Sequence, residues 1–340
     1  MRETVTPPPL EPPGLEVVGL RKSFGAVAAV REVSFRVPAG TAFGVVGPNG
    51  AGKTTTLRMI VNILTPDAGH IRFRGRPVAD LPAGAFGYLP EERGLYPRMR
   101  VREQLTFFGE LAGLPRGEAR RRADAWIERL GLGPWADKPA QALSKGNAQK
   151  AQLATALLHE PDLVILDEPF SGLDPVNVDL LKSIIHEQVR SGRTLLFSSH
   201  RMDHVEELCQ GVCLIAGGRS LLAGTLDEVK RADGRRTLRL AFAGTVAAGV
   251  AATTERYEAV ARELGLAVAR RGVDYWEYVI EPGRPVEPGA LLDRVRAFGI
   301  PIRFEIGLPS LERIYIDRVG ALTPDQQAGE RSRPGEEVRA

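Results

Sequence analysis

The segment between residues 47 and 54 combines residue types that could bind the phosphates of a nucleotide. It reads GPNGAGKT and fits the spacing G-x-x-x-x-G-K-[ST]. Its glycines let the backbone turn tightly so that successive N–H groups point at an anion, while Lys53 adds a positive charge and Thr54 a hydroxyl for Mg²⁺. The segment predicts a site for ATP or GTP that is formed by Gly47, Pro48, Asn49, Gly50, Ala51, Gly52, Lys53, Thr54 and Thr55.

Two adjacent carboxylates end an apolar run further along the chain. Residues 163–169 read LVILDEP, and open α/β sheets bind ligands at the carboxyl ends of their strands. We expect Asp167 to hold Mg²⁺ through water, and Glu168 to orient and deprotonate the water that attacks a γ-phosphate. A solvated acidic turn is the alternative, but an apolar strand rarely ends in neighbouring carboxylates without a cation nearby.

One of the histidines follows a motif and four do not. His200 comes after two serines at the end of the run TLLFSSH, where an imidazole can contact the γ-phosphate and the attacking water. A purely structural role is the alternative for this residue. For the histidines without a motif we expect surface or capping positions; these are His70, His159, His186 and His204.

These residues need a strand, a loop and a helix in sequence, and a sheet that brings several strand ends together. Residues 41–47 predict a buried strand and residues 54–64 a helix with one apolar face. Two antiparallel strands over 15–37 are predicted before the loop, and a third strand around 70–74 after it.

Residues 96–218 predict a helical insert within an α/β fold. Helical spacing dominates from residue 96 to residue 158, and strands then alternate with helices. The near-continuous apolar strands favour a mostly parallel sheet covered on both faces. Helices are predicted at 101–114, 116–132, 145–158, 176–190 and 202–209, and strands at 162–168, 194–200 and 211–218.

A charged linker at 231–236 predicts the start of a second, smaller domain. Its predicted order is strand 238–243, helix 255–264, strands 266–270 and 275–280, helix 288–298, strand 302–306 and a last helix. This order suggests a small ferredoxin-like α+β module. In the last helix, Leu311, Ile314, Tyr315 and Val319 have helical spacing and would pack on the small sheet.

A chain of 340 residues is too long for one comfortable core, so we expect two folded domains. The predicted boundaries are a disordered tail over 1–14, a first domain over 15–230 with a helical subdomain at about 95–160, a second domain over 236–320, and a disordered tail over 321–340.

Composition restricts the class of protein further. The formal net charge is +3 and both signs are interspersed, so nucleic-acid binding is not implied. Cys209 and Cys213 are too few for a disulfide framework, and we expect them to be structural thiols in a reducing cytosol. The chain has no secretory signal and no run of about 18 apolar residues, so we expect it to be soluble unless a partner anchors it.

The motifs occur in the order that is typical of one protein family. Phe24 precedes a glycine, and then come the phosphate loop, GYLPE at 87–91, LSKGN at 143–147, LVILDEP, SGLD at 171–174 and SSH at 198–200. Over roughly residues 15–227 the chain resembles the ATP-binding subunit of an ABC transporter. The resemblance implies a P-loop NTPase fold of the ABC type, α/β in class, with a mostly parallel sheet, an antiparallel β subdomain and a helical subdomain. It also implies that Phe24 stacks on adenine, although an ordinary aromatic at a strand edge is the alternative.

LSKGN corresponds to the LSGGQ sequence of the family, which contacts the γ-phosphate bound by a second subunit. The resemblance implies that Ser144 and Gly146 close over the ATP of a partner, so that two sites form at a head-to-tail dimer interface. Asp174 of SGLD is included in the implied nucleotide site. The C-terminal module either widens this dimer contact or senses a ligand, and the sequence leaves both readings open.

Three residues depart from the family pattern. Lys145 and Asn147 differ from LSGGQ, and Glu91 stands where the family usually has a glutamine that touches Mg²⁺ and senses the transport subunit. A carboxylate can still ligate Mg²⁺. The departures resemble a bacterial branch with an appended C-terminal domain, related to sodium-extrusion and drug-efflux ATPases, and impaired hydrolysis is the alternative.

The resemblance implies an ATP hydrolase that powers export across a membrane which the chain does not itself enter. It implies ATP and Mg²⁺ as cofactors, a second ATP-binding subunit and integral membrane permease subunits as partners, contacts near 91–100, and a cytoplasmic location peripheral to the inner face of the cell membrane. The predicted catalytic residues are Lys53, Glu168 and His200, and the predicted metal ligands are Thr54, Glu91 and Asp167. The alternatives are a soluble ABC ATPase that acts as a clamp on ribosomes or DNA, and a regulatory nucleotide-binding module without turnover.

Overall fold

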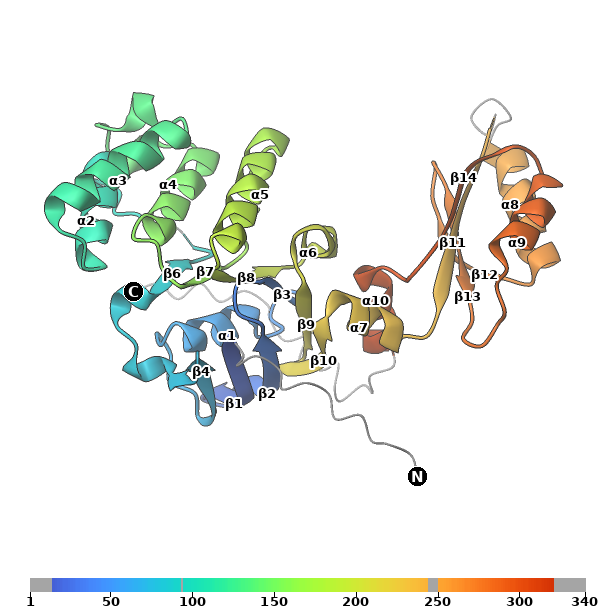
Figure 1. Cartoon of the computed structure of the whole chain (residues 1–340), viewed down its shortest axis with the longest axis horizontal. Helices are drawn as coiled ribbons and strands as arrows, with labels where there is room; N and C mark the ends of the chain where they lie inside the picture. Colours follow the sequence, from blue (N-terminus) through green and yellow to red (C-terminus); the bar gives the residue numbers. More distant parts are fainter. Residues whose placement is uncertain (1–13, 93, 244–249, 321–340) are drawn as a thin grey trace. The chain divides into compact units, whose positions relative to one another are not determined.

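The chain folds around two separate sheets, one in each of two units (Figure 1). The computed structural model describes residues 14–92, 94–243 and 250–320. In this part of the chain the first unit runs to Leu226 and resumes at Arg318, and the second unit is Asp227–Asp317. The predicted tails lie outside the described residues, apart from Gly14.

The sheet of the first unit has ten strands in the order β5-β4-β1-β2-β10-β9-β3-β8-β7-β6. Its centre is parallel from β9 through β3, β8 and β7 to β6. Every residue of β3, β7, β8 and β9 is buried, as expected for strands covered on both faces. These strands are β3 (Ala42–Val46), β6 (Phe86–Leu89), β7 (Leu163–Leu166), β8 (Thr194–Ser199) and β9 (Gly211–Ala216).

The other half of this sheet is mainly antiparallel. β1 lies between β2 and β4, and alternate residues of β1 such as Leu15 and Val17 are fully buried on one face. A single parallel pairing, Arg219 with Glu32, joins β2 to β10, and β10 pairs antiparallel with β9 at the edge of the parallel centre. The strands are β1 (Leu15–Phe24), β2 (Val27–Val37), β4 (Ala68–Phe73), β5 (Arg76–Pro77) and β10 (Arg219–Thr225).

Helices flank the sheet and form the predicted insert (Figure 1). α2 packs on α3 and on α4, and these three helices lie together at one end of the first unit. The helices are α1 (Lys53–Ile60), α2 (Val101–Leu111), α3 (Arg116–Arg129), α4 (Lys145–Leu157), α5 (Pro175–Arg190), α6 (Met202–Leu208) and α7 (Leu226–Ala232), with short 3₁₀ segments at Val78–Asp80, Ala83–Ala85, Gly133–Trp135 and Ala140–Ala142.

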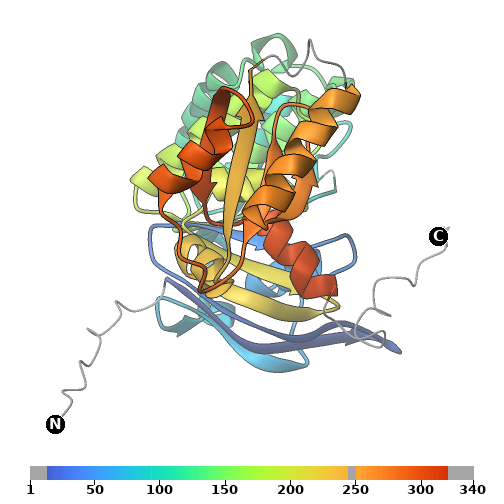
Figure 2. The same ribbon diagram turned by 90° about the vertical axis from the view of Figure 1, so that its right-hand side faces the viewer.

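The second unit contains a four-stranded antiparallel sheet in the order β12-β13-β11-β14. This strand order, with one helix in each crossover, is the ferredoxin-like arrangement that the sequence predicted. Figures 1 and 2 show both crossover helices on one face, where Leu240, Tyr257 and Val295 share a buried cluster. The elements are β11 (Arg236–Phe242), α8 (Val250–Leu264), β12 (Ala267–Arg271), β13 (Trp276–Ile280), α9 (Pro288–Arg296), β14 (Pro301–Gly307) and α10 (Leu311–Gly320).

Several details differ from the sequence-based expectations. The linker expected at 231–236 is shorter, because α7 continues to Ala232 and β11 begins at Arg236. β5, β6, β10 and α7 were not predicted. Leu311 and Ile314 of α10 are buried, but the apolar cluster of the small sheet does not include them. The predicted domain boundaries, 15–230 and 236–320, remain predictions, and the structure itself divides the chain after Leu226.

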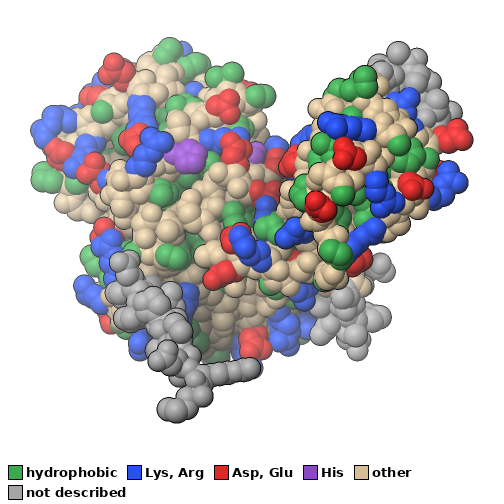
Figure 3. All heavy atoms as spheres, turned by 45° about the vertical axis from the view of Figure 1, so that its right-hand side comes forward, with side chains coloured by type: hydrophobic (Ala, Val, Ile, Leu, Met, Phe, Trp, Pro, Cys, Tyr) green, Lys and Arg blue, Asp and Glu red, His purple; other side chains and the backbone are tan. Residues whose placement is uncertain are grey.

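Positive and negative side chains are interspersed over the face drawn in Figure 3. In the part of the chain that the structure describes, no helix has the length and apolar character needed to cross a membrane.

Candidate functional site

The phosphate loop joins β3 to α1 and is shaped by close backbone approaches. A Cβ on Gly47 would lie 2.1 Å from the carbonyl oxygen of Ile215, and Gly52 has a φ of +102°, which favours glycine. Among the described residues, the backbone N–H groups of Gly50, Gly52 and the first three residues of α1 have no acceptor. Free N–H groups at the start of a helix form a site for an anion.

The ammonium of Lys53 lies inside this loop. Its Nζ donates to the carbonyl oxygens of Gly47 at 2.9 Å and Pro48 at 3.1 Å, and only 6% of the residue is exposed. The same atom lies 3.6 Å from Oε1 of Glu168. Lys53 therefore places a buried positive charge between the loop and the acidic segment that follows β7.

Asp167 and Glu168 lie at the carboxyl end of β7, next to the end of β8. The hydroxyl of Ser198 donates to Oδ1 of Asp167 at 2.5 Å, and it accepts from the backbone N–H of Glu168 at 2.9 Å. Asp167 is fully buried and Glu168 is 7% exposed. Glu168 has a φ of +48°, a left-handed conformation that is uncommon for a residue other than glycine and is typical of functional sites.

Burial governs the ionisation of this segment. It raises the pKa of Asp167 above 3.8, while the hydrogen bond from Ser198 and the nearby hydroxyl of Thr54 act in the opposite direction. It also raises the pKa of Tyr88 to about 12, and the negative charge of Asp167 adds to that increase. A cation near Asp167 would stabilise its ionised form.

Two of the remaining predicted residues approach the acidic pair or the loop. Nδ1 of His200 lies 2.9 Å from Oε2 of Glu168, and the histidine side chain is 55% exposed. Oε2 of Glu91 lies 3.5 Å from the hydroxyl of Thr54. The fold thus brings together side chains that follow β3, β6, β7 and β8.

The donor set fits a magnesium ion. Oδ2 of Asp167 and Oε1 of Glu168 are buried and accept no hydrogen bond from any described residue. Carboxylate and hydroxyl oxygens are hard ligands of the kind that Mg²⁺ prefers, with substrate phosphates completing its shell. No group of three or more His, Cys, Asp or Glu in the described residues could hold a metal by itself, as expected where a hydroxyl and phosphates contribute.

Phe24 stands at the end of β1, next to a two-residue turn into β2. Its ring is exposed to 50%, and Nζ of Lys22 lies 5.9 Å from the ring centroid. An exposed aromatic face beside a positive charge can stack on a nucleobase. No described contact joins Phe24 to the phosphate loop.

The LSKGN segment lies against the SGLD turn of the same chain. Ser144 is the N-cap of α4 and accepts from the backbone N–H of Asn147 at 3.3 Å. A Cβ on Gly172 would lie 2.4 Å from Cε of Lys145, so the lysine stem crosses the turn closely. In the described residues, no hydrogen bond or ion pair joins Ser144 or Gly146 to the phosphate loop. Within one chain these residues are therefore not part of the loop site.

Asp174 caps α5. Its Oδ1 accepts from the backbone N–H of Asn177 at 2.9 Å and its Oδ2 from the side-chain amide of the same residue at 2.7 Å. These hydrogen bonds hold the pKa of Asp174 below its usual value. Within the chain, Asp174 therefore has a structural role at the start of a helix.

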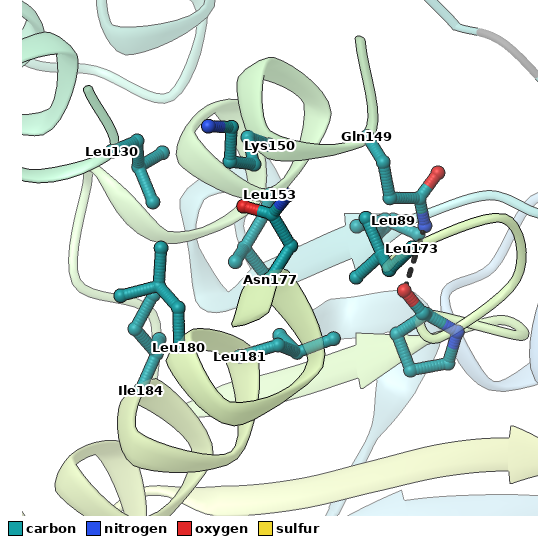
Figure 4. Close-up of a pocket in the computed structure, with 11 residues that line it drawn as sticks. Leu89, Leu130, Gln149, Lys150, Leu153, Leu173, Asn177, Leu180, Leu181 and Ile184 are labelled. Carbon is teal, nitrogen blue, oxygen red and sulfur yellow. Dashed lines mark hydrogen bonds between the residues drawn. The ribbon is translucent and has the colours of Figure 1, made fainter. Parts of the chain in front are cut away.

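A narrow apolar pocket separates α4 from α5 (Figure 4). Figure 4 shows Leu153 of α4 and Leu181 of α5 on its walls, and Gln149 donates to the carbonyl oxygen of Pro169 at 3.1 Å. Partial burial lowers the pKa of Lys150, which also lines the pocket. The pocket lies between α4 and the segment that follows Glu168, so its walls are part of the packing between these two elements.

Sequence reasoning missed two features near the acidic segment. Ser198, named only as part of a motif, bridges Asp167 and Glu168, and only the pairing of β7 with β8 brings it there. His204, expected at the surface or in a cap, is 4% exposed and lies with its ring centroid 4.3 Å from that of Phe170. The expectation was wrong because α6 packs on the parallel sheet, which local sequence does not reveal.

Comparison with known proteins gives consistent similarities. The family model described as ABC transporter matches residues 30–171. YhaQ of Bacillus subtilis, an uncharacterized ABC transporter ATP-binding protein, is 39% identical over 313 residues, which cover 91% of this chain and 99% of YhaQ.

Two further similarities each cover 64% of the chain. Nod factor export ATP-binding protein I of Ralstonia nicotianae is 38% identical over 220 residues, which cover 64% of this chain and 68% of that protein. A solved ATP-binding subunit of an ABC transporter has a TM-score of 0.60 at 33% identity and covers 64% of this chain and 92% of its own.

Proposed function

Because this chain belongs to the family of ABC transporter ATP-binding proteins, we propose that it is the ATP-hydrolysing subunit of an exporter and that Glu168 activates the attacking water. Family membership makes the chain an ATPase coupled to transport. Its assignment to export rests on similarity to proteins such as the Nod factor export protein of Ralstonia nicotianae. The comparisons give no support to a clamp on ribosomes or DNA.

The observation that carries the residue assignment is the environment of Glu168. One carboxylate oxygen contacts His200, and the other accepts no hydrogen bond from a described residue and lies 3.6 Å from the ammonium of Lys53. A buried carboxylate with an oxygen that accepts no hydrogen bond from a described residue can accept a proton from water. The left-handed backbone of Glu168 holds this oxygen in place.

The roles of the other residues follow from charge. The free N–H groups of the phosphate loop and Lys53 would bind the β- and γ-phosphates, and Lys53 would exchange its carbonyl partners for phosphate oxygens. Water would add to the γ-phosphorus as the bond to the β-phosphate oxygen breaks, and its proton would pass to Glu168. His200 would orient Glu168 and contact the γ-phosphate. Phe24 would stack on adenine.

Thr54, Asp167 and Glu91 would hold Mg²⁺ beside the phosphates. When bound, the ion would neutralise charge on the phosphate oxygens. Glu91 supplies a carboxylate where the family usually has an amide, and its 3.5 Å distance to the hydroxyl of Thr54 supports a place in this shell.

Ser144 and Gly146 would act on the nucleotide of a second subunit, because within their own chain they make no hydrogen bond or ion pair to the described loop. Such an arrangement gives two shared sites in a head-to-tail dimer. The start of α4, with the N-cap Ser144 exposed, supplies N–H groups suited to an anion. Asp174 would support this interface by fixing the SGLD turn.

An aromatic patch in the helical insert is a candidate surface for a membrane subunit. Tyr96 and Phe107 are 52% and 37% exposed, with ring centroids 6.1 Å apart, and Leu111 on the same helix as Phe107 is 65% exposed. Exposed aromatic residues at this density are typical of protein interfaces. The patch lies next to residues 91–100, where contacts with the permease are expected, and would give the chain a peripheral membrane location.

The function is tested with Glu168→Gln. This variant should bind Mg·ATP but hydrolyse it about a hundredfold or more slowly than wild type, whereas Glu103→Gln, at an exposed position of α2, should hydrolyse normally. Glu168→Gln trapped with Mg·ATP and purified from solubilised native membranes should bring a polytopic membrane protein with it. Equal hydrolysis by both variants would remove Glu168 from catalysis, and ribosomal or DNA-associated partners alone would contradict the transport assignment.

A further inference from the structure

Three arginines surround a hollow at one end of the small sheet, far in sequence from the nucleotide site. Arg231 lies in the last turn of α7, Arg235 lies in the connection to β11, and Arg236 begins β11. The opposite wall is the end of β14, with Ile306 and the residues that follow it. The hollow measures about 390 Å³, within the range of pockets that bind small molecules. All its lining residues belong to the second unit.

The charge of the hollow is positive. No Asp or Glu is among its described lining residues. Four arginines in or beside it, at 231, 235, 236 and 313, face three aspartates, at 227, 233 and 317, which leaves one positive charge. The side chain of Arg236 has no hydrogen bond or ion pair with any described residue, and it is exposed. Arg236 therefore carries the uncompensated charge.

Arg235 is held in place, and both Arg235 and Arg231 keep N–H donors that no described residue accepts. Arg235 uses three of its five N–H donors on Asp233 and Asp317, each at 2.6 Å, and only 19% of its side chain is exposed. Arg231 contacts Asp227 through Nε at 2.7 Å and keeps the donors of both terminal nitrogens. Fixed guanidinium groups lose little conformational freedom when they bind a planar or tetrahedral anion.

The other wall of the hollow is apolar. Ile306 is half-buried against the cluster beneath the crossover helices, and Leu308 follows the end of β14. The backbone carbonyl of Leu308 accepts a hydrogen bond from the hydroxyl of Thr237 at 3.4 Å, which connects this wall to β11. Gly307 between them has no atom within 4 Å of the position of a Cβ, so this wall leaves open space.

We propose that this hollow binds a small amphipathic anion, in which a carboxylate or phosphate group contacts Arg231, Arg235 and Arg236 and an apolar part lies on Ile306 and Leu308. Guanidinium groups bind both kinds of anion through paired hydrogen bonds. The second unit thus carries a ligand site of its own, separate from the nucleotide site of the first unit. The proposal does not depend on the transport assignment, because binding to the second unit needs neither hydrolysis nor a membrane partner.

Calorimetric titration of the full chain tests the proposal, with the phosphate loop first saturated with Mg·ADP. The probes are hexanoate, hexyl phosphate and, as a neutral match, 1-hexanol. We expect saturable binding of at least one anion with one site per chain and no binding of the alcohol. Arg236→Gln and Arg231→Gln should each weaken anion binding by about tenfold or more. Arg262→Gln, at an exposed position of α8 outside the hollow, is the matched control and should bind like wild type.

The results of the titration decide whether the hollow binds an anion and which kind of anion it binds. Binding of hexyl phosphate alone or hexanoate alone supports the site and identifies its anion. Absence of saturable binding, equal binding of 1-hexanol, or equal weakening by Arg262→Gln and Arg236→Gln would overturn the proposal. Both pocket variants replace exposed side chains, so their thermal unfolding midpoints should match that of wild type, and Arg231→Gln repeats the test if Arg236→Gln does not fold.

Discussion

At the scale of residues, the site concentrates buried charge that the chain alone does not compensate. Lys53, Asp167 and Glu168 are each less than a tenth exposed, and two carboxylate oxygens lack hydrogen-bond partners in the described residues. Buried charges without full compensation are costly. Phosphates and a divalent cation would supply the missing partners, which explains why a folded protein keeps such residues here.

Asp167 gives a prediction about pH and stability. Burial raises the pKa of Asp167, so the folded chain binds a proton on this carboxylate more tightly than the unfolded chain does. The free energy of unfolding therefore falls as the pH rises through the raised pKa. Asp167→Asn removes this titration. Without nucleotide, the unfolding midpoint of Asp167→Asn minus that of wild type should therefore be larger at about pH 7.5 than at about pH 4, which lies near the ordinary pKa of an aspartate.

The pH dependence distinguishes the effect of the Asp167 charge from the effect of altered packing, because any change in packing caused by the amide is the same at both pH values. Asp179→Asn, at an exposed position of α5, is the control and should not reproduce the trend. A difference that is constant with pH, or that decreases, would show that the buried charge of Asp167 does not limit the stability of the nucleotide-free chain.

Phe24 gives a prediction about nucleotide affinity. Phe24→Ala should raise the KM for ATP by about three- to tenfold with little change in kcat, because a stacking contact is worth roughly 0.5–1.5 kcal/mol and is present before and during hydrolysis. Val27→Ala, on the next strand and 65% exposed, is the control. An unchanged KM in Phe24→Ala would remove the ring from the site.

At the scale of elements, strand pairing brings together the residues to which we assign catalysis. β7 lies between β6 and β8, so the residues that follow these strands meet at one edge of the sheet. α4 begins beside the SGLD turn that follows Glu168, and the apolar pocket between α4 and α5 keeps these helices in register. The insert therefore contacts the hydrolytic segment through packing, and its outer surface carries the aromatic patch.

The aromatic patch gives a prediction about coupling. Phe107→Ser should leave the ATPase activity of the isolated chain unchanged, because the residue lies on α2 away from the described nucleotide contacts. In vesicles reconstituted with the membrane subunits, stimulated ATPase activity should fall by about tenfold if the patch contacts them.

Ile63→Ser changes an apolar residue that is 58% exposed after α1, and it serves as the control in both assays. Equal stimulation of Phe107→Ser and Ile63→Ser would exclude the patch as a coupling surface.

At the scale of the whole molecule, the proposed nucleotide site has two halves that one chain carries without bringing them together. The loop side has Lys53 and Glu168, and the other side has the start of α4, which makes no hydrogen bond or ion pair to the described loop. Two chains in head-to-tail order would complete both sites. The second unit adds a hollow lined by three arginines, for which we proposed an anionic ligand.

Mixing two inactive variants tests the shared sites. Lys53→Ala should lose phosphate binding in its own loop, and Gly146→Asp should repel the phosphates of the partner. A Cβ on Gly146 meets only Leu173, at 3.9 Å, so the aspartate fits its own chain. Each variant alone should be inactive, and an equal mixture should regain at most about a quarter of wild-type activity, because half of the dimers would contain one intact site.

Gly117→Asp is the matched control, since a Cβ there meets no atom within 4 Å and the residue lies on α3. It should retain activity alone. A mixture of Lys53→Ala and Gly146→Asp that stays inactive, measured under conditions in which the chains exchange, would contradict sites shared between subunits.

The sequence by itself determined the features that depend on neighbouring residues. Glycine spacing and Lys53 defined the phosphate loop, apolar runs located the buried strands, and alternation of elements gave the ferredoxin-like order of the second unit. It missed β5, β6 and β10. The residues of β10 are only partly buried and follow a tight turn through two glycines, so the pattern of burial in this strand is weak.

Only the tertiary structure decided which distant residues meet. The strand order β3-β8-β7-β6 differs from the order along the chain, and it brings His200 to Glu168 and Ser198 to Asp167. In the same way, the pairing of β11 with β14 brings Arg236 opposite the end of β14. The local sequence of a strand does not specify which other strand it pairs with, because the pairing depends on how the apolar faces of the whole unit pack together.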